Sequence, residues 1–203
     1  MLRGLIAENQ RSWTSAAGSR GDELLILFPN ALPGPEVLKT DARTVGCWAA
    51  SPDARLDAHL LALGFEPGWQ PHWMCARAEP SPPDPRVSEP SEVPEYDDHG
   101  QSLLRLTQER PQTSFLFVAR EDGAFGGHVW LHAAAGVGGL YDMFVVESLR
   151  RRGLGSALAA AASAKAAALG IETLTLNAEA EGFWRALGFR SLGHGQTWWL
   201  HRT

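Results

Sequence analysis

The chain has 203 residues, of which 44% are hydrophobic, and a formal net charge of −5 at pH 7. A negatively charged chain is a poor match for nucleic acid, which usually requires a basic face. No apolar run approaches the length that crosses a bilayer, and the N-terminal residues, which include Arg3, Glu8 and Arg11, lack the pattern of a secretory signal. These properties predict a cytoplasmic protein that binds neither nucleic acid nor membrane.

Metal and disulfide chemistry find no support in the sequence. The patterns Cys-x-x-Cys and His-Glu-x-x-His are absent, so no metal site is predicted. The only two cysteines are Cys47 and Cys75. We expect both to be buried free thiols, because disulfides are rare in the cytoplasm.

In chain order, the first elements are two strand candidates, Glu23–Phe28 and Thr44–Ala49, and a helix over residues 52–63. The helix ends in the tripeptide Leu63-Gly64-Phe65. Together they predict a first folded unit over residues 1–79.

A proline-rich segment follows, with six prolines between residues 79 and 94 among serines and acidic residues. Proline stiffens the backbone into an extended form and removes hydrogen-bond donors. The segment 80–94 is therefore predicted to be a linker, and residues 95–203 a second unit.

The second unit contains an apolar strand, Tyr141–Val146, that leads into the turn Arg150-Arg151-Arg152-Gly153-Leu154-Gly155-Ser156. Glycine lets the backbone approach a ligand, and the first N–H groups of the helix after the turn have no helical partner. The helix dipole and the arginines both favour an anion. The turn is therefore predicted to bind a phosphorylated ligand, with a pyrophosphate as a suitable group.

The elements after this turn follow a regular order. An alanine-rich helix is predicted over residues 153–169, with Gly170 as its left-handed stop. A short strand, Thr173–Asn177, and a helix over residues 179–187 complete the pattern, and the second helix ends in Leu187-Gly188-Phe189.

Three of these features resemble the GNAT N-acetyltransferase superfamily. They are the R-x-x-G-x-G spacing after an apolar strand, Asn177 after the next strand, and the ending aromatic-x-x-Leu-Gly-Phe that begins at Trp184. The resemblance covers residues 93–203. It implies an α/β (α+β) GNAT fold, in which helices flank a mixed central sheet.

The resemblance also implies that acetyl-CoA is the co-substrate. The pantetheine arm would pair with the strand backbone as an added strand. The residues implied in binding are Met143, Phe144 and Val145 for pantetheine, the backbone of Arg151, Arg152, Gly153, Leu154, Gly155 and Ser156 for the pyrophosphate, and Arg150 and Arg152 for direct charge contacts. Asn177 either lies at the cleft between the two strands or caps the following helix.

The implied reaction is direct attack of a primary amine, on a small molecule or a peptide, on the thioester. Trp184 stands where many family members have a tyrosine, and its indole N–H can stabilise the leaving thiolate but cannot protonate it. Tyr141 and Asp142 are the other catalytic candidates, Asp142 as a base. Tyr141 either reaches the cleft from its strand or packs in the sheet. His128 and His132, four residues apart on a predicted strand and so on one face, are further candidate bases.

The two Leu-Gly-Phe segments suggest an internal repeat. Each follows a helix and precedes a strand, a turn and a strand that bears tryptophan. The first unit is therefore predicted to be a truncated, degenerate GNAT-like half that lacks R-x-x-G-x-G and helps to wall the acceptor site. With this half in place, a monomer is plausible as well as a homodimer.

Two other functions remain open. The first is an acyl-CoA-binding sensor or regulatory protein without turnover, which the replacement of tyrosine by Trp184 favours. The second is an interaction module in which the arginine turn binds an unrelated anion.

Overall fold

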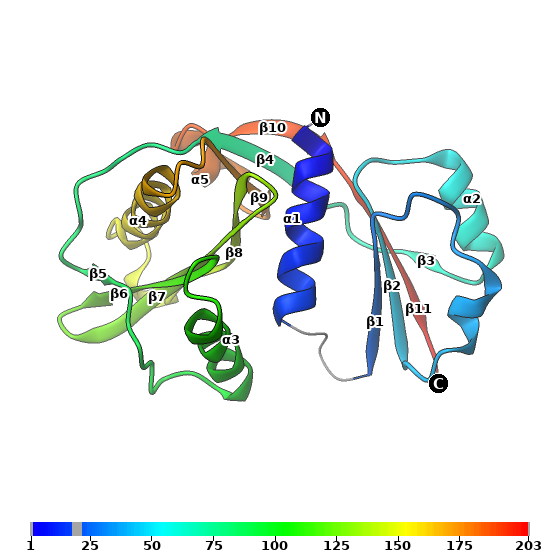
Figure 1. Ribbon diagram of the computed structural model, residues 1–203, viewed down its shortest axis with the longest axis horizontal. Helices are drawn as coiled ribbons and strands as arrows, with labels where there is room; N and C mark the ends of the chain where they lie inside the picture. The colour runs from blue at the N-terminus through cyan, green and yellow to red at the C-terminus, as the bar shows by residue number, and fades with distance from the viewer. Residues whose placement is uncertain (1, 18–21, 203) are drawn as a thin grey trace.

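A computed structural model describes residues 2–17 and 22–202, which form two sheets with a helix between them (Figure 1). The helices are α1 (Leu2–Ala17), η1 (Pro35–Lys39), α2 (Ala54–Ala62), α3 (Asp98–Glu109), η2 (Glu147–Leu149), α4 (Leu154–Ala168) and α5 (Glu181–Ala186). The strands are β1 (Glu23–Leu27), β2 (Thr44–Ala49), β3 (Glu66–Pro67), β4 (His72–Arg77), β5 (Val87–Ser88), β6 (Ser114–Glu121), β7 (Ala124–Ala134), β8 (Val137–Val145), β9 (Thr173–Ala178), β10 (Arg190–His194) and β11 (Gln196–His201).

The larger sheet has seven strands in the order β10-β4-β9-β8-β7-β6-β5. Strands β8 and β9 run parallel, and the other neighbours are antiparallel. Helix α4 covers one face, where Leu154, Leu158 and Ala162 are buried in the main core. Helices α1 and α3 pack on the other face around Trp130. The predicted mixed sheet flanked by helices is confirmed.

The smaller sheet has four strands in the order β1-β2-β11-β3. One face is closed by α2, because Leu56 and Leu60 of this helix pack against Val45 and Cys47 of β2. Cys47 and Cys75 are both buried and free, as predicted.

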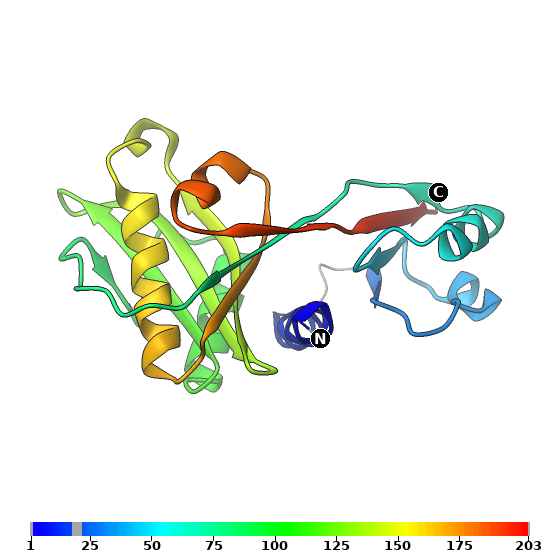
Figure 2. The same ribbon diagram turned by 90° about the horizontal axis from the view of Figure 1, so that it is seen from above.

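The two sheets are joined by a two-stranded antiparallel ribbon. One strand of the ribbon runs through β3 and β4, and the other through β10 and β11, so that each strand contributes to both sheets. Figure 2 shows the cyan-green and red segments crossing between the two lobes. At the crossing, the N–H of Gly195 donates to the carbonyl of Pro71 at 2.8 Å. A Cβ at Gly195 would lie 2.5 Å from the carbonyl oxygen of Ala49, so glycine permits this close approach.

The strand order of the two sheets matches once the ribbon is taken into account. The parallel pair β1-β2 of the smaller sheet corresponds to the parallel pair β8-β9 of the larger sheet. The next two strands are β11 and β3 in the smaller sheet, and β4 and β10 in the larger one. Strands β4 and β11 are therefore exchanged between the two halves of the chain. Each half also places a helix, α2 or α5, between the second strand of its parallel pair and its edge strand.

The repeated Leu-Gly-Phe tripeptide forms the same helix ending in both halves. In α2, the N–H of Phe65 donates to the carbonyl of Leu60, and in α5 the N–H of Phe189 donates to that of Trp184, both at 3.0 Å. The glycine between has φ of +88° at Gly64 and +84° at Gly188. This is the Schellman ending, in which a left-handed glycine lets the next apolar residue turn back onto the core.

Helix α1 is an element that the sequence analysis did not predict. Its buried residues Ile6, Asn9 and Trp13 recur at helical spacing, but a polar residue in the middle of the buried stripe obscures the pattern. The helix lies between the two sheets (Figure 1) and packs on β7 and β8.

The proline-rich segment is packed along the larger sheet instead of spanning free space. Residues Val87 and Ser88 form β5 and pair with Ala119 and Val118 of β6. Val93 is only 1% exposed and belongs to the core beneath α3. Prolines are tolerated around β5 because it is an edge strand, in which few backbone N–H groups are needed for pairing. The unit boundaries drawn at this segment stay a prediction.

Candidate functional site

A cleft opens where β8 and β9 separate. The two parallel strands pair from Gly138 to Leu140 on β8 and not beyond. Two residues later, Asp142 has φ of +46° and lies in a bulge, where the register between β7 and β8 shifts. A bulge bends its strand and turns side chains to new directions. The backbone edge of β8 after Leu140 is therefore free of β9 and faces the opening.

A cavity of about 1000 Å³ fills this opening. Its volume lies at the upper end of the range for small-molecule sites. Its walls come from β8, the turn after it, the start of α4, the end of β9 and helix α5. The lining residues are Leu140, Asp142, Met143, Phe144, Val145, Leu149, Arg150, Arg151, Gly153, Leu154, Gly155, Ser156, Leu176, Asn177, Glu179, Ala180, Phe183 and Trp184.

Most of the predicted site residues therefore meet in one place. Of the residues predicted for catalysis or cofactor binding, Tyr141, Arg152 and the two candidate bases His128 and His132 do not line the cavity, and all the others do. The sequence analysis did not single out the apolar wall formed by Leu149, Leu176 and Phe183. The apolar periodicity of the strand and helices that carry them gives no signal that separates a cavity wall from a core.

Helix α4 points its N-terminus into the cavity. Its N-cap is Gly153, with φ of +83°, and the N–H of Ala157 donates to the carbonyl of Gly153 at 2.9 Å to close the first turn. The N–H groups of Leu154, Gly155 and Ser156 precede that bond and have no carbonyl one turn earlier to bind. They and the helix dipole favour an anion at this end of the cavity.

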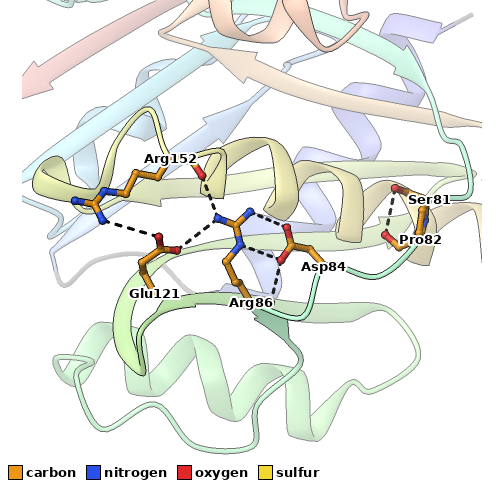
Figure 3. Close-up of polar contacts among 6 residues, drawn as sticks. All are labelled: Ser81, Pro82, Asp84, Arg86, Glu121 and Arg152. Atoms are coloured by element: carbon orange, nitrogen blue, oxygen red, sulfur yellow. Dashed lines mark hydrogen bonds and ion pairs between the residues drawn. The ribbon is translucent and has the colours of Figure 1, made fainter.

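The three adjacent arginines point in different directions. Arg150 and Arg151 line the cavity, and Arg150 Nε donates to the carbonyl of Val145 at 3.2 Å. Arg152 lies instead on the outer side of the turn, where its Nη1 is 3.9 Å from a carboxylate oxygen of Glu121 (Figure 3). The direct charge contact predicted for Arg152 is thus not favoured by its position.

Asn177 has a side-chain oxygen with no partner. Its Oδ1 is buried, and among the described residues it accepts no hydrogen bond. The N-cap of α5 is Ala180, so Asn177 does not cap that helix. A buried acceptor without a donor is costly, and a ligand amide in the cavity would supply one.

An acidic and aromatic group lies at the bulge of β8. The carboxylate of Asp142 is half exposed and 3.7 Å from Nε2 of His128. The His128 ring packs edge-on against Tyr96 at 5.3 Å between centroids. The hydroxyl of Tyr96 is buried without a partner among the described residues. Burial raises the pKa of this hydroxyl, and the negative charges of Asp142 and Glu95 raise it further. Tyr96 stands outside the recognised motifs, so only the tertiary structure brings it here.

Tyr141 is held away from the cavity. Its ring stacks on Trp13 of α1 at 4.7 Å, and its hydroxyl donates to Oδ1 of Asn9 at 2.6 Å. Burial raises its pKa. The side chain of Tyr141 points to the α1 side of the sheet, so the predicted catalytic role does not suit it.

Trp184 lines the cavity and is also part of the core. It is 7% exposed and packs edge-on against Phe183 and Phe189 at about 5 Å between centroids. The position that carries tyrosine in many relatives is therefore filled here by a well-packed indole.

His132 shares a face of β7 with His128, as the spacing predicts, and it is the more deeply buried of the two. It is 1% exposed, and its ring nitrogens are 2.9 Å from Ser12 Oγ and 3.0 Å from Ser114 Oγ. Burial, and then Arg110, lowers its pKa to about 4. His132 is thus a structural residue. Among residues 2–17 and 22–202, no group of three or more metal-ligating side chains comes together.

Comparisons with known proteins agree with this architecture. The family profile described as the acetyltransferase (GNAT) family matches residues 76–189. Among curated proteins, no sequence matches the chain significantly. No helix in the described part of the chain combines the length and apolarity that a bilayer crossing needs.

Solved structures share the fold at low sequence identity. A GCN5-related N-acetyltransferase from Kribbella flavida is 17% identical with a TM-score of 0.56, over 81% of this chain and 74% of that one. One from Sphaerobacter thermophilus is 18% identical with a TM-score of 0.55, over 78% of this chain and 59% of that one. A tandem GNAT protein from the clavulanic acid biosynthesis pathway is 15% identical with a TM-score of 0.58, over 82% and 67%.

The matched profile spans more than half of the chain and includes the parted strands, the turn before α4 and the helix of Trp184. The chain belongs to the GNAT acetyltransferase family.

Proposed function

We propose that the protein transfers an acetyl group from acetyl-CoA to a primary amine. The observation that carries this proposal is the parting of β8 and β9 directly in front of the N-terminus of α4. It joins a free strand edge, which suits an extended amide-bearing chain, to a group of unpaired N–H donors, which suits a pyrophosphate.

The described residues fit acetyl-CoA at both ends of the cavity. Met143, Phe144 and Val145 would pair with the pantetheine amides, and Asn177 Oδ1 would accept from one of their N–H groups. The first turn of α4, with Arg150 and Arg151, would hold the pyrophosphate. When bound, acetyl-CoA supplies an activated acyl group and a thiolate leaving group.

The acceptor side is suited to a cationic amine. The half-exposed carboxylate of Asp142 attracts an ammonium group, and His128 stands 3.7 Å away to take up a proton directly or through water. Trp184 would donate its indole N–H toward the leaving sulfur, and solvent would supply the proton. The acceptor is a small-molecule or peptide amine, and the protein acts in the cytoplasm as a monomer or homodimer.

The test of donor binding is a substitution that keeps the helix intact. Ser156 is exposed in the first turn of α4 and lines the cavity. Ser156→Asp places a carboxylate at a helix N-terminus, which preserves or raises stability, but repels a pyrophosphate. We expect the variant to lose calorimetric acetyl-CoA binding by at least tenfold, while Ser102→Asp on α3 retains it. Failure of the unmodified protein to bind acetyl-CoA would reject the proposal.

A second candidate function is an acyl-CoA sensor without turnover. The chain has two tyrosines, Tyr96 and Tyr141, and neither lines the cavity, so the usual acid of the reaction has no phenolic substitute there. A sensor binds acetyl-CoA but releases no free thiol when a panel of amines is supplied. Trp184→Tyr separates the two cases, because a sensor that lacks only the acid would gain measurable thiol release.

A further inference from the structure

Arg86 lies in the proline-rich segment and contacts the outer side of the turn between β8 and α4. Its Nη1 donates to the carbonyl oxygen of Arg152 at 3.0 Å (Figure 3). The two residues are 66 positions apart in the chain. The backbone carbonyl of Arg86 also accepts from the N–H of Arg120 at 2.8 Å, which fixes this segment to β6.

Carboxylates hold the guanidinium of Arg86 in place. Asp84 accepts from Nε at 3.0 Å and from Nη2 at 2.8 Å, a paired geometry that fixes the plane of the guanidinium. Glu121 accepts from Nη1 at 3.4 Å. Hydrogen bonds from Arg86 lower the pKa of Asp84 to about 2, so this carboxylate stays charged through the neutral range.

The turn that Arg86 contacts has an unusual backbone. Arg151 has φ of +64° and Gly153 has φ of +83°, one on each side of Arg152. A left-handed conformation is unfavourable for a residue with a side chain such as Arg151, so other contacts must hold this turn in place. The bond from Arg86 to the carbonyl between these two residues is such a contact.

The direction of that bond determines where the next N–H points. In a planar trans peptide, the carbonyl of Arg152 and the N–H of Gly153 point in opposite directions. Arg86 holds the carbonyl on the outer side of the turn, and Gly153 lines the cavity while Arg152 does not. The N–H of Gly153 is thereby directed inward, beside the free N–H groups of α4.

We propose that Arg86 is a positioning residue for the pyrophosphate of acetyl-CoA. It acts through the Arg152–Gly153 peptide and does not touch the ligand. It withdraws a carbonyl oxygen that would repel the phosphates and presents an N–H in its place. The inference rests on the proposed function, and it assigns a role in donor binding to a segment outside the family motif.

The experiment compares Arg86→Gln with Arg120→Gln. Arg120→Gln is a matched control because it removes the same charge as Arg86→Gln. The side chain of Arg120 is about as exposed as that of Arg86, and it forms an ion pair with Glu95 at 2.7 Å. We expect Arg86→Gln to raise the calorimetric dissociation constant of CoA about tenfold, the effect of about 1.4 kcal/mol, and Arg120→Gln to change it less than twofold.

Two further readouts separate positioning from general damage to the fold. Binding of pantetheine, which lacks the pyrophosphate, is expected to be equal in Arg86→Gln and the unmodified protein. Arg86→Lys is expected to recover part of the loss, because an ammonium group still donates to the Arg152 carbonyl. If Arg86→Gln does not fold, Asp84→Asn takes its place, with a smaller loss of CoA affinity expected.

The outcomes distinguish the two proposals. If the unmodified protein binds no CoA, the proposed function fails and this inference falls with it. If it binds CoA and Arg86→Gln binds equally well, or if pantetheine affinity falls in parallel with CoA affinity, the positioning role is overturned and the proposed function stands.

Discussion

At the scale of single residues, the proposed acceptor end of the cavity contains the carboxylate of Asp142. The bulge at φ +46° brings its carboxylate to the cavity and within 3.7 Å of the His128 ring. This places a negative charge and a proton acceptor at the position where an ammonium group would lose its proton. Next to His128, the hydroxyl of Tyr96 and the indole N–H of Trp130 are buried without partners among the described residues.

The first prediction concerns this carboxylate. Asp142→Asn removes the charge that attracts the ammonium group and faces His128 but keeps the shape, and we expect kcat/KM for an amine acceptor to fall about 100-fold, an effect of the size of general acid–base catalysis. The measurement is thiol release at varied amine concentration. CoA affinity is expected to stay within twofold. A normal kcat/KM would remove Asp142 from the acceptor site.

The second prediction concerns His132 and pH. Its folded pKa of about 4 lies below the ordinary 6.5, so the unfolded chain binds more protons in between. Stability from this residue is fully present above pH 6.5 and is lost as the pH falls toward 4, by about 3 kcal/mol in total. Urea unfolding at pH 7.5, 6 and 5 measures it. His132→Gln should flatten the profile, and an unchanged slope would contradict the assignment.

How much of the site the sequence predicts depends on how local each signal is. The turn from Arg150 to Ser156 is a local pattern, so its spacing alone predicts an anion site, which stays a prediction. The directions of Tyr141 and Arg152 depend on partners far away in the chain, Asn9 and Glu121, and no local pattern records them. Sequence analysis therefore groups most of the residues that line the cavity, but it cannot give the directions of these two side chains.

At the scale of elements, the buried amide of Asn9 links α1 to the larger sheet. Nδ2 of Asn9 donates toward the carbonyls of His132, Ala134 and Val137 at 2.9–3.0 Å, and its Oδ1 accepts from Tyr141. Asn9 is fully buried. The two N–H bonds of this amide are thus shared among three carbonyls at the turn end of the β7–β8 hairpin.

The third prediction tests this attachment. Asn9→Ala leaves several buried polar groups without partners and is expected to lower the free energy of unfolding by about 3 kcal/mol. Tyr141→Phe removes only one hydroxyl and is expected to cost about 1 kcal/mol. Chemical denaturation of both variants gives the comparison. Equal losses would mean that the Asn9 bonds to the hairpin carbonyls add nothing.

Prediction from sequence succeeds for elements with their own start and stop signals. Helix α4 occupies the predicted range to within a residue, and Gly170 has the expected positive φ of +75°. Helix α1 lacks such signals, because the polar residue Asn9 interrupts the buried stripe that would otherwise show helical spacing up to Trp13. Its position depends on the hairpin that it covers, which lies over 100 residues later.

At the scale of the whole molecule, we propose that the first sheet is a truncated GNAT-like half. Its support is the shared strand order and the shared helix ending at Phe65 and Phe189. The exchange of β4 and β11 could not be predicted, because each Leu-Gly-Phe segment is equally compatible with a strand pair that stays in its own half. The pairing between halves is decided only by tertiary contacts.

The fourth prediction follows from the shared ribbon. Neither sheet is complete without a strand from the other half of the chain, so the two lobes should unfold together. We expect a single calorimetric transition with equal calorimetric and van't Hoff enthalpies. Two separated transitions would show that the lobes are independent despite the exchange.

The ribbon also bears on how the chain is made. A ribosome releases β1, β2 and β3 early, but β11, which must lie between β2 and β3, emerges after every other strand. Until then the edge of β2 remains open, and an open edge readily pairs with foreign strands. The first lobe therefore cannot close before β11 has been synthesised. A nascent chain of this protein should depend on chaperones that shield strand edges until β11 emerges.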